Sequence, residues 1–400
     1  MKIGIFTECY HPVMNGVVVS IDTFKTELEK RGHEFYIFTT ECQSYDETDN
    51  HIHRFQAITR TEPKGGSYPI SKPQNVNNVA ESIRDLNLDL IHSQHLMSTG
   101  SLGLKVAQRL GIPAVLTYHT LLTEYIHYIP ILKYFIKYWP LNWMAKKWVI
   151  RKSRNYCNQY DAIVTPSPSM KKLLIEYGVK TQITPIPTGI DLSKFQNQYS
   201  KKELKAKYKI PEEQDFIFLY VSRIGKEKNI YFLLETMRKL IKEKNYSKAH
   251  LLLVGGGDEL EKAKNLIKKW GLEKHFTFTG GLPHEEVIKV FGGADCFVFS
   301  SVTETQGIII QEAQASGLPV IAVNIMGPSD YIKDGIDGFL VPLNINQFTD
   351  IMIHVIMMPE DERKKMGENA KRNVQEYTAE KSAIKMEKLY ESTKNNYRSQ

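Results

Sequence analysis

The sequence predicts an α/β protein with two Rossmann-like, doubly wound domains that face each other across a cleft. Three observations lead to this prediction. Short apolar runs rich in β-formers alternate with helical patterns along the chain, which is typical of parallel sheets. The alternation restarts after a segment containing Pro and Gly near residue 190. The length of 400 residues also suits two domains better than one core.

The expected strands fall into two sets. The first set comprises KIGIF (2–6), FYIFT (35–39), LDLIH (88–92), PAVLTYH (113–119) and DAIVTPS (161–167). The second set comprises FIFLYVSR (216–223), AHLLLVGGG (249–257), FTFTG (276–280), CFVFS (296–300) and PVIAVN (319–324). We therefore expect an N-terminal domain over residues 1–190 and a C-terminal domain over residues 191–378. Helical periodicity predicts a closing amphipathic helix after residue 379.

The composition is that of a globular protein, with 42% hydrophobic and 24% charged residues. No apolar run reaches the ~20 residues that span a bilayer, and MKIGIF lacks the features of a signal peptide, so we expect neither element. The four cysteines follow no metal-binding spacing, which favours reduced thiols in a cytoplasmic protein. The net charge of +7 is compatible with an anionic partner, such as a membrane, a phosphate or a nucleic acid.

The segment TETQGIIIQEAQASG (303–317) follows an expected strand and leads into a helix expected to begin near Ile308. Gly307 allows backbone amides to approach a ligand, and a helix N-terminus favours oxygen-rich or anionic groups. Glu304 precedes the helix and Glu312 lies just over one turn inside it. Both can therefore accept hydrogen bonds from one extended ligand, such as a nucleotide-linked sugar. A solvated glutamate pair with a capping role explains this segment equally well on its own.

A second segment, VSRIGKEKNI (221–230), lies at the end of the first strand of the second domain. Arg223 can clamp two phosphate oxygens and Lys228 adds a mobile charge, so the pair suits a diphosphate. The alternative is a solvated basic turn, which is the expected state of Lys226. A third segment, LVGGGDE (253–259), also joins a strand to a helix, and a tight turn is favoured there over a phosphate loop.

Two segments of the first domain lie at comparable junctions. In YHPVMNGVVVS (10–20), Asn15 and Gly16 precede a helix whose first backbone N–H groups are expected to be bare and to face the cleft. In TYHT (117–120), His119 lies at the carboxyl end of a strand, where ligands bind in such sheets. A lone histidine is more often structural, and the position of this one is what favours a ligand contact.

Taken together, these segments resemble a known family. NGV, YHT, SRIGKEKN, GGGDELE, FTGGLPHEEV and TETQGIIIQEAQASGLPVIA occur in the order and at the distances of the retaining glycosyltransferases of family 4, which have the GT-B fold. The resemblance covers nearly the whole chain. The set is highly specific, whereas no single segment is.

The resemblance implies a site for a nucleotide-sugar donor. Arg223 and Lys228 would bind the donor diphosphate, aided by the amide of Gly16. Glu312 would hold the ribose hydroxyls, and His119 would contact the sugar near the reacting carbon. Glycosyl transfer builds negative charge on the leaving diphosphate, which the two cations would stabilise in the transition state. No obvious nucleophile stands out, which agrees with front-face attack by the acceptor.

The same resemblance implies that Glu304 and the amides through Gly307 and Ile308 hold the donor sugar, and that the backbone around Leu282 pairs with the base. Gln306 replaces the aromatic residue of many members, and ETQG resembles the subgroup that glucosylates diacylglycerol, with UDP-glucose as the expected donor. Such enzymes need no tightly bound cofactor and no divalent metal. Their closing helix, here residues 379–400, packs back on the N-terminal domain.

The segment YIPILKYFIKYWPLNWMAKKWVIRKSRNY (128–156) holds three of the four tryptophans and no acidic residue. Trp and Tyr favour the membrane interface, and each Lys or Arg near anionic headgroups adds ~1 kcal/mol. We expect Pro140 to divide the segment into two short helices that form a monotopic anchor. The alternative is a packed helix pair with a solvated basic face. The residues expected to contact the membrane are Lys133, Lys137, Trp139, Trp143, Lys146, Lys147, Trp148, Arg151 and Lys152.

The leading hypothesis is a peripheral enzyme on the cytoplasmic face of the cell membrane. It would transfer a hexose, expected to be glucose from UDP-glucose, to a lipid such as 1,2-diacylglycerol. The first alternative is a soluble family 4 enzyme with a small or polysaccharide acceptor, and the second is a non-catalytic two-lobed binding protein. Nucleic acid is not an expected partner, because the sequence has no recognised nucleic-acid module. The sequence leaves open the donor sugar and base, the linkage position, the addition of a second sugar and the oligomeric state.

Overall fold

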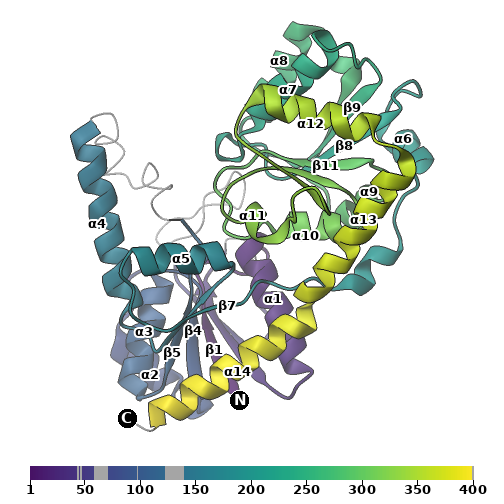
Figure 1. Cartoon of the computed structure of the whole chain (residues 1–400). Coiled ribbons are helices and arrows are strands. Elements are labelled where there is room, and N and C mark those ends of the chain that lie inside the picture. Colours follow the sequence, from purple (N-terminus) through teal and green to yellow (C-terminus); the bar gives the residue numbers. More distant parts are fainter. Residues whose placement is uncertain (43–44, 46, 58–70, 97, 122–138, 399–400) are drawn as a thin grey trace. The chain divides into compact units, whose positions relative to one another are not determined.

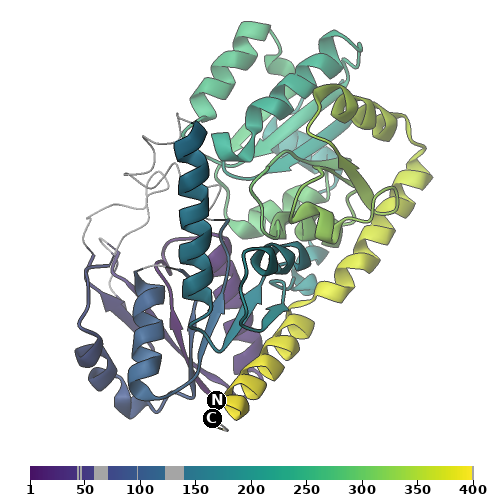
Figure 2. The same ribbon diagram turned by 60° about the vertical axis from the view of Figure 1, so that its left-hand side comes forward.

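The computed structural model describes the chain except for residues 43–44, 46, 58–70, 97, 122–138 and 399–400. The chain divides into two compact units. Unit 1 comprises Met1–Gly189 together with the closing segment Ala379–Gln400, and unit 2 comprises Ile190–Thr378. Figures 1 and 2 show that each unit is a sheet with helices packed on both faces.

Unit 1 contains a seven-stranded sheet with the strand order β3-β2-β1-β4-β5-β6-β7. Every pairing within it is parallel, and Ile3 of β1 pairs with Phe35 on one side and Leu90 on the other. Continuous apolar runs form the inner strands because helices cover both faces of the sheet. The strands are β1 (Lys2–Phe6), β2 (Glu34–Thr40), β3 (Ile52–Phe55), β4 (Leu90–Ser93), β5 (Ala114–Thr117), β6 (Ala162–Thr165) and β7 (Ile183–Pro185).

The helices of unit 1 include the closing helix of the chain. They are α1 (Gly16–Glu29), α2 (Val76–Ser82), α3 (Thr99–Leu110), α4 (Trp139–Cys157), α5 (Pro168–Glu176) and α14 (Ala379–Arg398). Helix α14 lies beside α1 (Figures 1 and 2), and its Met386 and Tyr390 share a buried core with Ile3 of β1. The hydroxyl of Tyr390 also lies 2.6 Å from Nδ1 of His92 in β4. These contacts attach the end of the chain to unit 1.

Unit 2 contains a six-stranded parallel sheet with the strand order β10-β9-β8-β11-β12-β13. Alternate residues of β8 enter two different cores. Phe218 and Tyr220 pack with α7, α8 and α12, whereas Ile217 and Leu219 pack with α6, α9 and α10. The strands are β8 (Phe216–Val221), β9 (Ala249–Val254), β10 (Phe276–Gly280), β11 (Cys296–Phe299), β12 (Val320–Val323) and β13 (Gly338–Val341). The helices are α6 (Lys201–Tyr208), α7 (Ile230–Lys242), α8 (Leu260–Trp270), α9 (His284–Phe291), α10 (Ile308–Ala315), α11 (Pro328–Tyr331), α12 (Ile345–Met357) and α13 (Glu360–Val374).

The predicted doubly wound α/β class is confirmed in each unit. The strand order reverses between β1 and β4 in unit 1 and between β8 and β11 in unit 2. Ligands of open parallel sheets bind beyond the carboxyl ends of the strands at such reversal points. The loops that follow β1, β4, β8 and β11 are therefore where a site is expected. In the described part of the chain, no helix is long and apolar enough to cross a membrane.

Candidate active site

The reversal point of unit 2 brings together a lysine and a glutamate from two loops. Lys228 ends the short 3₁₀ helix η5 (Lys226–Lys228) after β8, and Glu304 lies in the loop after β11. Nζ of Lys228 lies 2.5 Å from Oε1 of Glu304, and both side chains are mostly buried. Two further hydrogen bonds join these loops, because Ser300 donates to the carbonyl of Lys228 and Thr303 to that of Glu227.

Arg223 has a carboxylate partner of its own. Its guanidinium lies 2.6 Å from Oε1 of Glu227, and about half of the arginine side chain is exposed. Sequence reasoning did not single out Glu227, although it lies in the same segment as Arg223 and directly before Lys228. Arg223 and Lys228 therefore each carry a counter-ion when no ligand is bound. A carboxylate beside each cation fixes its position and leaves further donors for an anion, because a guanidinium has five N–H groups and an ammonium three.

The glycine segment after β9 supports the loop that carries Arg223. Gly255 has a φ of +144°, and a Cβ built on it would lie 1.9 Å from the carbonyl oxygen of Ser222. A Cβ on Gly257 would lie 2.4 Å from the carbonyl oxygen of Ile224. The backbone N–H of Ile224 in turn donates to the carbonyl of Gly256 at 2.8 Å. The tight turn that was favoured for this segment is what the structure contains, and its function here is close backbone packing.

Helix α10 begins directly after Gly307, whose φ of +77° favours glycine. The helix therefore begins at Ile308, as predicted, with an N-cap residue that has no side chain to satisfy the first amides. The side chain of Gln306 is buried and donates from Nε2 to Oε1 of Gln311 at 2.7 Å. The amide of Gln306 thus contacts the helix that it precedes.

Glu312 lies on the second turn of α10 and is almost completely buried. Its Oε1 atom lies 2.9 Å from Nε2 of His284, the first residue of α9. Leu282 is half-buried two residues earlier, in the loop between β10 and α9. The contact between His284 and Glu312 therefore joins the loop around Leu282 to α10. Sequence reasoning did not single out His284, although it lies within the segment FTGGLPHEEV that supports the family resemblance.

The prediction of bare amides at the start of α1 is wrong in part. Oδ1 of Asn15 accepts hydrogen bonds from the backbone N–H groups of Val17 at 2.8 Å and of Val18 at 3.0 Å. Asn15 caps the helix in this way because its short polar side chain reaches the second and third amides. The amide of Gly16 is outside this cap, and a Cβ built on Gly16 would meet no described atom within 4 Å.

His119 lies just beyond β5, close to two other histidines at the carboxyl edge of the unit 1 sheet. Its Nε2 atom lies 2.8 Å from Oε1 of Gln94, which follows β4. Burial lowers the pKa of His119 to about 3, and the electrostatic influence of His95 and His92 adds to this shift. The imidazole is therefore neutral near pH 7 and can act as a hydrogen-bond partner but not as a cation.

The basic helix α4 has one face buried against the rest of unit 1. Ala145, Val149, Ser153 and Cys157 recur at every fourth position and are buried. The hydroxyl of Tyr118, just after β5, lies 2.8 Å from Oγ of Ser153. The helix is therefore part of the unit 1 core on this side, as one alternative predicted.

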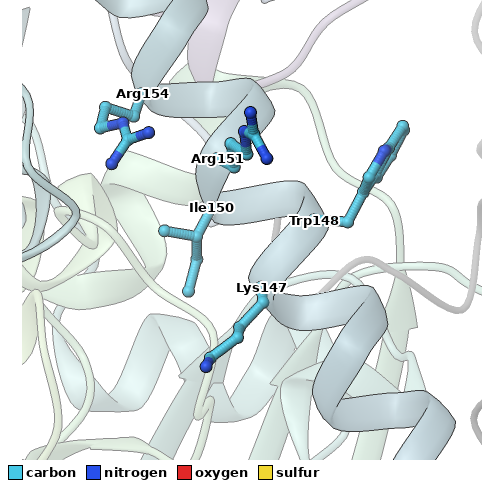
Figure 3. A pocket seen from close by; sticks show the side chains of 5 residues that line it. All are labelled: Lys147, Trp148, Ile150, Arg151 and Arg154. Carbon is cyan, nitrogen blue, oxygen red and sulfur yellow. The ribbon is translucent and has the colours of Figure 1, made fainter.

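The opposite face of α4 is basic, aromatic and exposed. Trp143, Met144 and Trp148 are 57%, 58% and 52% exposed. The ammonium of Lys147 lies 3.8 Å from the ring centroid of Trp143, and that of Lys152 lies 5.7 Å from the ring centroid of Trp148. A surface hollow of about 430 Å³ lies on this helix, and Figure 3 shows the side chains that line it. The described residues that line the hollow are Lys147, Trp148, Ile150, Arg151 and Arg154.

Part of the predicted membrane segment lies outside the described residues. This applies to Lys133 and Lys137 and to the first of the two predicted helices. The second helix begins at Trp139, so Pro140 lies in its first turn, where proline is tolerated. The predicted cations Lys146, Arg151 and Lys152 are exposed on this helix. Among the described residues, no group of three or more His, Cys, Asp or Glu side chains could hold a metal ion.

Two family models match the chain. The model described as "Glycosyltransferase Family 4" matches residues 14–194, and the model described as "Glycosyl transferases group 1" matches residues 200–373. An alpha-monoglucosyldiacylglycerol synthase of Streptococcus pneumoniae is 34% identical over 355 residues, covering 85% of this chain and 75% of the relative. A protein with the same description from Acholeplasma laidlawii is 31% identical over 397 residues, covering 98% of this chain and 96% of the relative.

Similar solved structures support the fold. Anabaena HepE in complex with UDP and glucose matches with a TM-score of 0.76 and 16% identity, covering 98% of this chain and 100% of that one. A sucrose-phosphate synthase from Thermosynechococcus elongatus matches with a TM-score of 0.74 and 22% identity, covering 98% of both chains. At these identities the likeness supports the two-sheet architecture of GT-B enzymes and carries no information about substrates.

Proposed function

This chain belongs to glycosyltransferase family 4, and on that premise we propose that it transfers glucose from UDP-glucose to the free hydroxyl of a diacylglycerol at a membrane surface. The observation that carries the proposal is the likeness to two monoglucosyldiacylglycerol synthases, one of which extends over nearly the whole length of both chains. The family is one of retaining, nucleotide-sugar-dependent hexosyltransferases. We therefore expect the glucose to keep its α configuration.

The donor diphosphate is assigned to Arg223 and Lys228. Both follow β8 at the strand-order reversal of unit 2, where parallel sheets bind ligands. A planar guanidinium can take two phosphate oxygens, and an ammonium adds a charge that can follow the leaving group. Because negative charge grows on the diphosphate as the glycosidic bond breaks, these contacts strengthen in the transition state and accelerate the reaction.

The ion pair between Lys228 and Glu304 suggests how the sugar is received. Without ligand the two side chains neutralise each other, with Nζ 2.5 Å from Oε1. A diphosphate would compete with Glu304 for the ammonium, because it offers more acceptor oxygens and more negative charge. The carboxylate of Glu304 would then turn to the sugar hydroxyls. Donor binding would in this way replace the ion pair between Lys228 and Glu304 with contacts from Lys228 to the diphosphate and from Glu304 to the sugar. Neither charged side chain would then be left without a partner.

The membrane surface is assigned to the exposed face of α4. A helix that lies on a bilayer needs apolar and aromatic side chains for the interface and cations for anionic headgroups. Trp143, Met144 and Trp148 meet the first need, and Lys147 and Arg151 of the hollow in Figure 3 meet the second. The buried face of the same helix holds it against unit 1. A diacylglycerol acceptor stays in the bilayer, so its enzyme requires such a surface.

A panel of substrates tests this function. The full-length protein is incubated with UDP-glucose, UDP-galactose, UDP-N-acetylglucosamine and GDP-mannose, each in the presence of diacylglycerol vesicles or of soluble acceptors. Release of the nucleoside diphosphate and the mass of the lipid product are followed together. We expect a lipid product from UDP-glucose that is absent without diacylglycerol. Release that depends on a soluble acceptor and ignores the vesicles would favour a family member with a soluble substrate.

A further inference from the structure

The contact between His284 and Glu312 leaves one carboxylate oxygen without a partner. Oε1 of Glu312 lies 2.9 Å from Nε2 of His284. Oε2 is buried, and no described residue forms a hydrogen bond with it. The glutamate side chain is 7% exposed, whereas that of His284 is 47% exposed. A buried acceptor of this kind is costly unless a ligand or water supplies the missing donor.

We propose that His284 is a positioning residue for nucleotide binding: it holds Oε1 of Glu312 so that Oε2 is presented to a ribose hydroxyl. This inference rests on the proposed function, in which Glu312 takes the ribose of the donor. A ribose hydroxyl is a neutral donor of the right kind for Oε2, and its removal in a deoxynucleotide leaves that atom unsatisfied again. The discrimination between ribose and deoxyribose is therefore assigned to a contact that His284 maintains.

A carboxylate as buried as that of Glu312 needs a partner to remain oriented. The terminal torsion of a glutamate is broad, so an unpartnered group samples several orientations. The Nε2–H of His284 holds Oε1 and so limits this motion. It thereby fixes which oxygen is free.

The histidine is responsive to pH because its charge depends on its neighbours. The hydrogen bond to Glu312 raises the pKa of His284, burial opposes this shift, and the charge of Glu312 adds to it. The other charged groups that face the ring are Lys194 of η4 (Leu192–Gln196), which lowers the pKa, and Glu285 on its own helix, which raises it. The histidine therefore carries a positive charge below the raised pKa, and it donates to Glu312 as a neutral imidazole once the pH has risen above that pKa.

A purely architectural role for His284 gives a different expectation. The contact joins the loop after β10 to α10, so its loss could lower stability without changing what the site recognises. In that case every nucleotide would lose affinity by the same factor. Positioning of Oε2 instead predicts that the loss falls on nucleotides that carry the ribose hydroxyl. The ratio between ribo- and deoxyribonucleotide affinity separates the two roles.

The test is calorimetric titration of UDP, 2′-deoxy-UDP and 3′-deoxy-UDP at pH 6.5. The proteins are the wild type, His284→Ala, His284→Gln and the control His354→Ala, which removes an exposed histidine of α12. We expect the wild type and the control to prefer UDP over at least one deoxynucleotide by about tenfold. His284→Ala should bind UDP about tenfold more weakly and lose that preference. His284→Gln should restore most of it, because the glutamine amide can donate to Oε1.

The pH dependence and the contrary outcomes complete the test. The difference in UDP affinity between the wild type and His284→Gln should shrink from pH 6 to pH 8.5, as the histidine loses its charge. An unchanged UDP preference in His284→Ala, or an equal loss for all three nucleotides, would overturn the inference. If the wild type binds GDP and not UDP, the uridine donor is wrong, and the same ratio measured with GDP and 2′-deoxy-GDP decides the inference. Binding of neither nucleotide would overturn both.

Discussion

The basic face of α4 gives a prediction whose size follows from the structure. The change replaces Lys146, Lys147, Arg151 and Lys152 with glutamine, which keeps side-chain length and helix propensity. All four side chains lie outside the buried face of the helix. Each cation near an anionic leaflet contributes about 1 kcal/mol. The loss of four is therefore worth about 4 kcal/mol, or roughly a thousandfold in partitioning, because 1.4 kcal/mol corresponds to a factor of ten.

Co-sedimentation with vesicles measures this partitioning. Vesicles with and without anionic phospholipid are used at 0.1 M and at 1 M salt, where the Debye length falls from about 10 Å to about 3 Å. The wild type should pellet with anionic vesicles at the lower salt, and most of the quadruple variant should remain in the supernatant. Trp143 and Trp148 are retained, so a weak, salt-independent association should persist. The affinity for UDP should be unchanged, because Arg223 and Lys228 belong to unit 2.

A matched control separates a local effect from one of net charge. Helix α8 of unit 2 carries four exposed lysines, and their replacement by glutamine removes the same number of charges. The control replaces Lys262, Lys264, Lys268 and Lys269. It should pellet like the wild type. A membrane surface on α4 is refuted if the α4 variant pellets as fully as the wild type at 0.1 M salt, or if the control loses as much vesicle binding as the α4 variant.

Three further predictions concern the two units. Alanine at Arg223 or at Lys228 should lower kcat/KM by two or more orders of magnitude while the protein stays folded, since one lost charge-assisted contact costs about 3 kcal/mol in a dry site; near-normal turnover would remove that residue from the donor site. In calorimetry with UDP, Glu312→Ala should bind weakly, whereas Glu304→Ala should bind at least as tightly as the wild type and fail in transfer, because Glu304 competes with the diphosphate for Lys228; equal losses would contradict this division. Burial lowers the pKa of His119 to about 3, against ~6.5 in the unfolded chain, so its contribution to stability is complete above pH ~6.5 and is lost as the pH falls toward 3. The Tm of His119→Gln should therefore fall less than that of the wild type between pH 7 and pH 5, and an equal fall would contradict the assigned shift.

The strands show where sequence reasoning succeeds. Every strand that was predicted is present, because those runs are apolar over most of their length and lie between two helical layers. The three strands that were missed, β3, β7 and β13, all lie at the edge of a sheet. Most of their residues are only half-buried, and IHRF and ITP lack the continuous apolar pattern of an inner strand. GFLV has that pattern, but it is a short run between Asp337 and Pro342. An edge strand is determined largely by its pairing with the neighbouring strand, and this pairing is not visible in its own sequence.

The candidate site shows where sequence reasoning stops. The strand ends predicted that Arg223, Lys228 and Glu304 lie in the loops after two strands, and the structure has them after β8 and β11, which are neighbours in the sheet. The partner of Glu312 could not be found in this way, since β10, which precedes His284, is not a neighbour of β11 in the sheet. The capping of α1 by Asn15 was accessible from the sequence, because asparagine before a helix is a common N-cap, and it was overlooked in favour of a ligand.

The product formed from UDP-glucose and diacylglycerol in anionic vesicles decides whether the chain is a retaining lipid glucosyltransferase. Donor labelled with ¹³C at the anomeric carbon allows the mass and the anomeric coupling of the lipid to be measured in one sample. We expect a monohexosyl diacylglycerol whose new linkage has the α configuration of the donor. A β-linked product would contradict retention. The absence of any glycolipid, with turnover restored by a soluble acceptor, would contradict the assignment of a membrane lipid as the substrate.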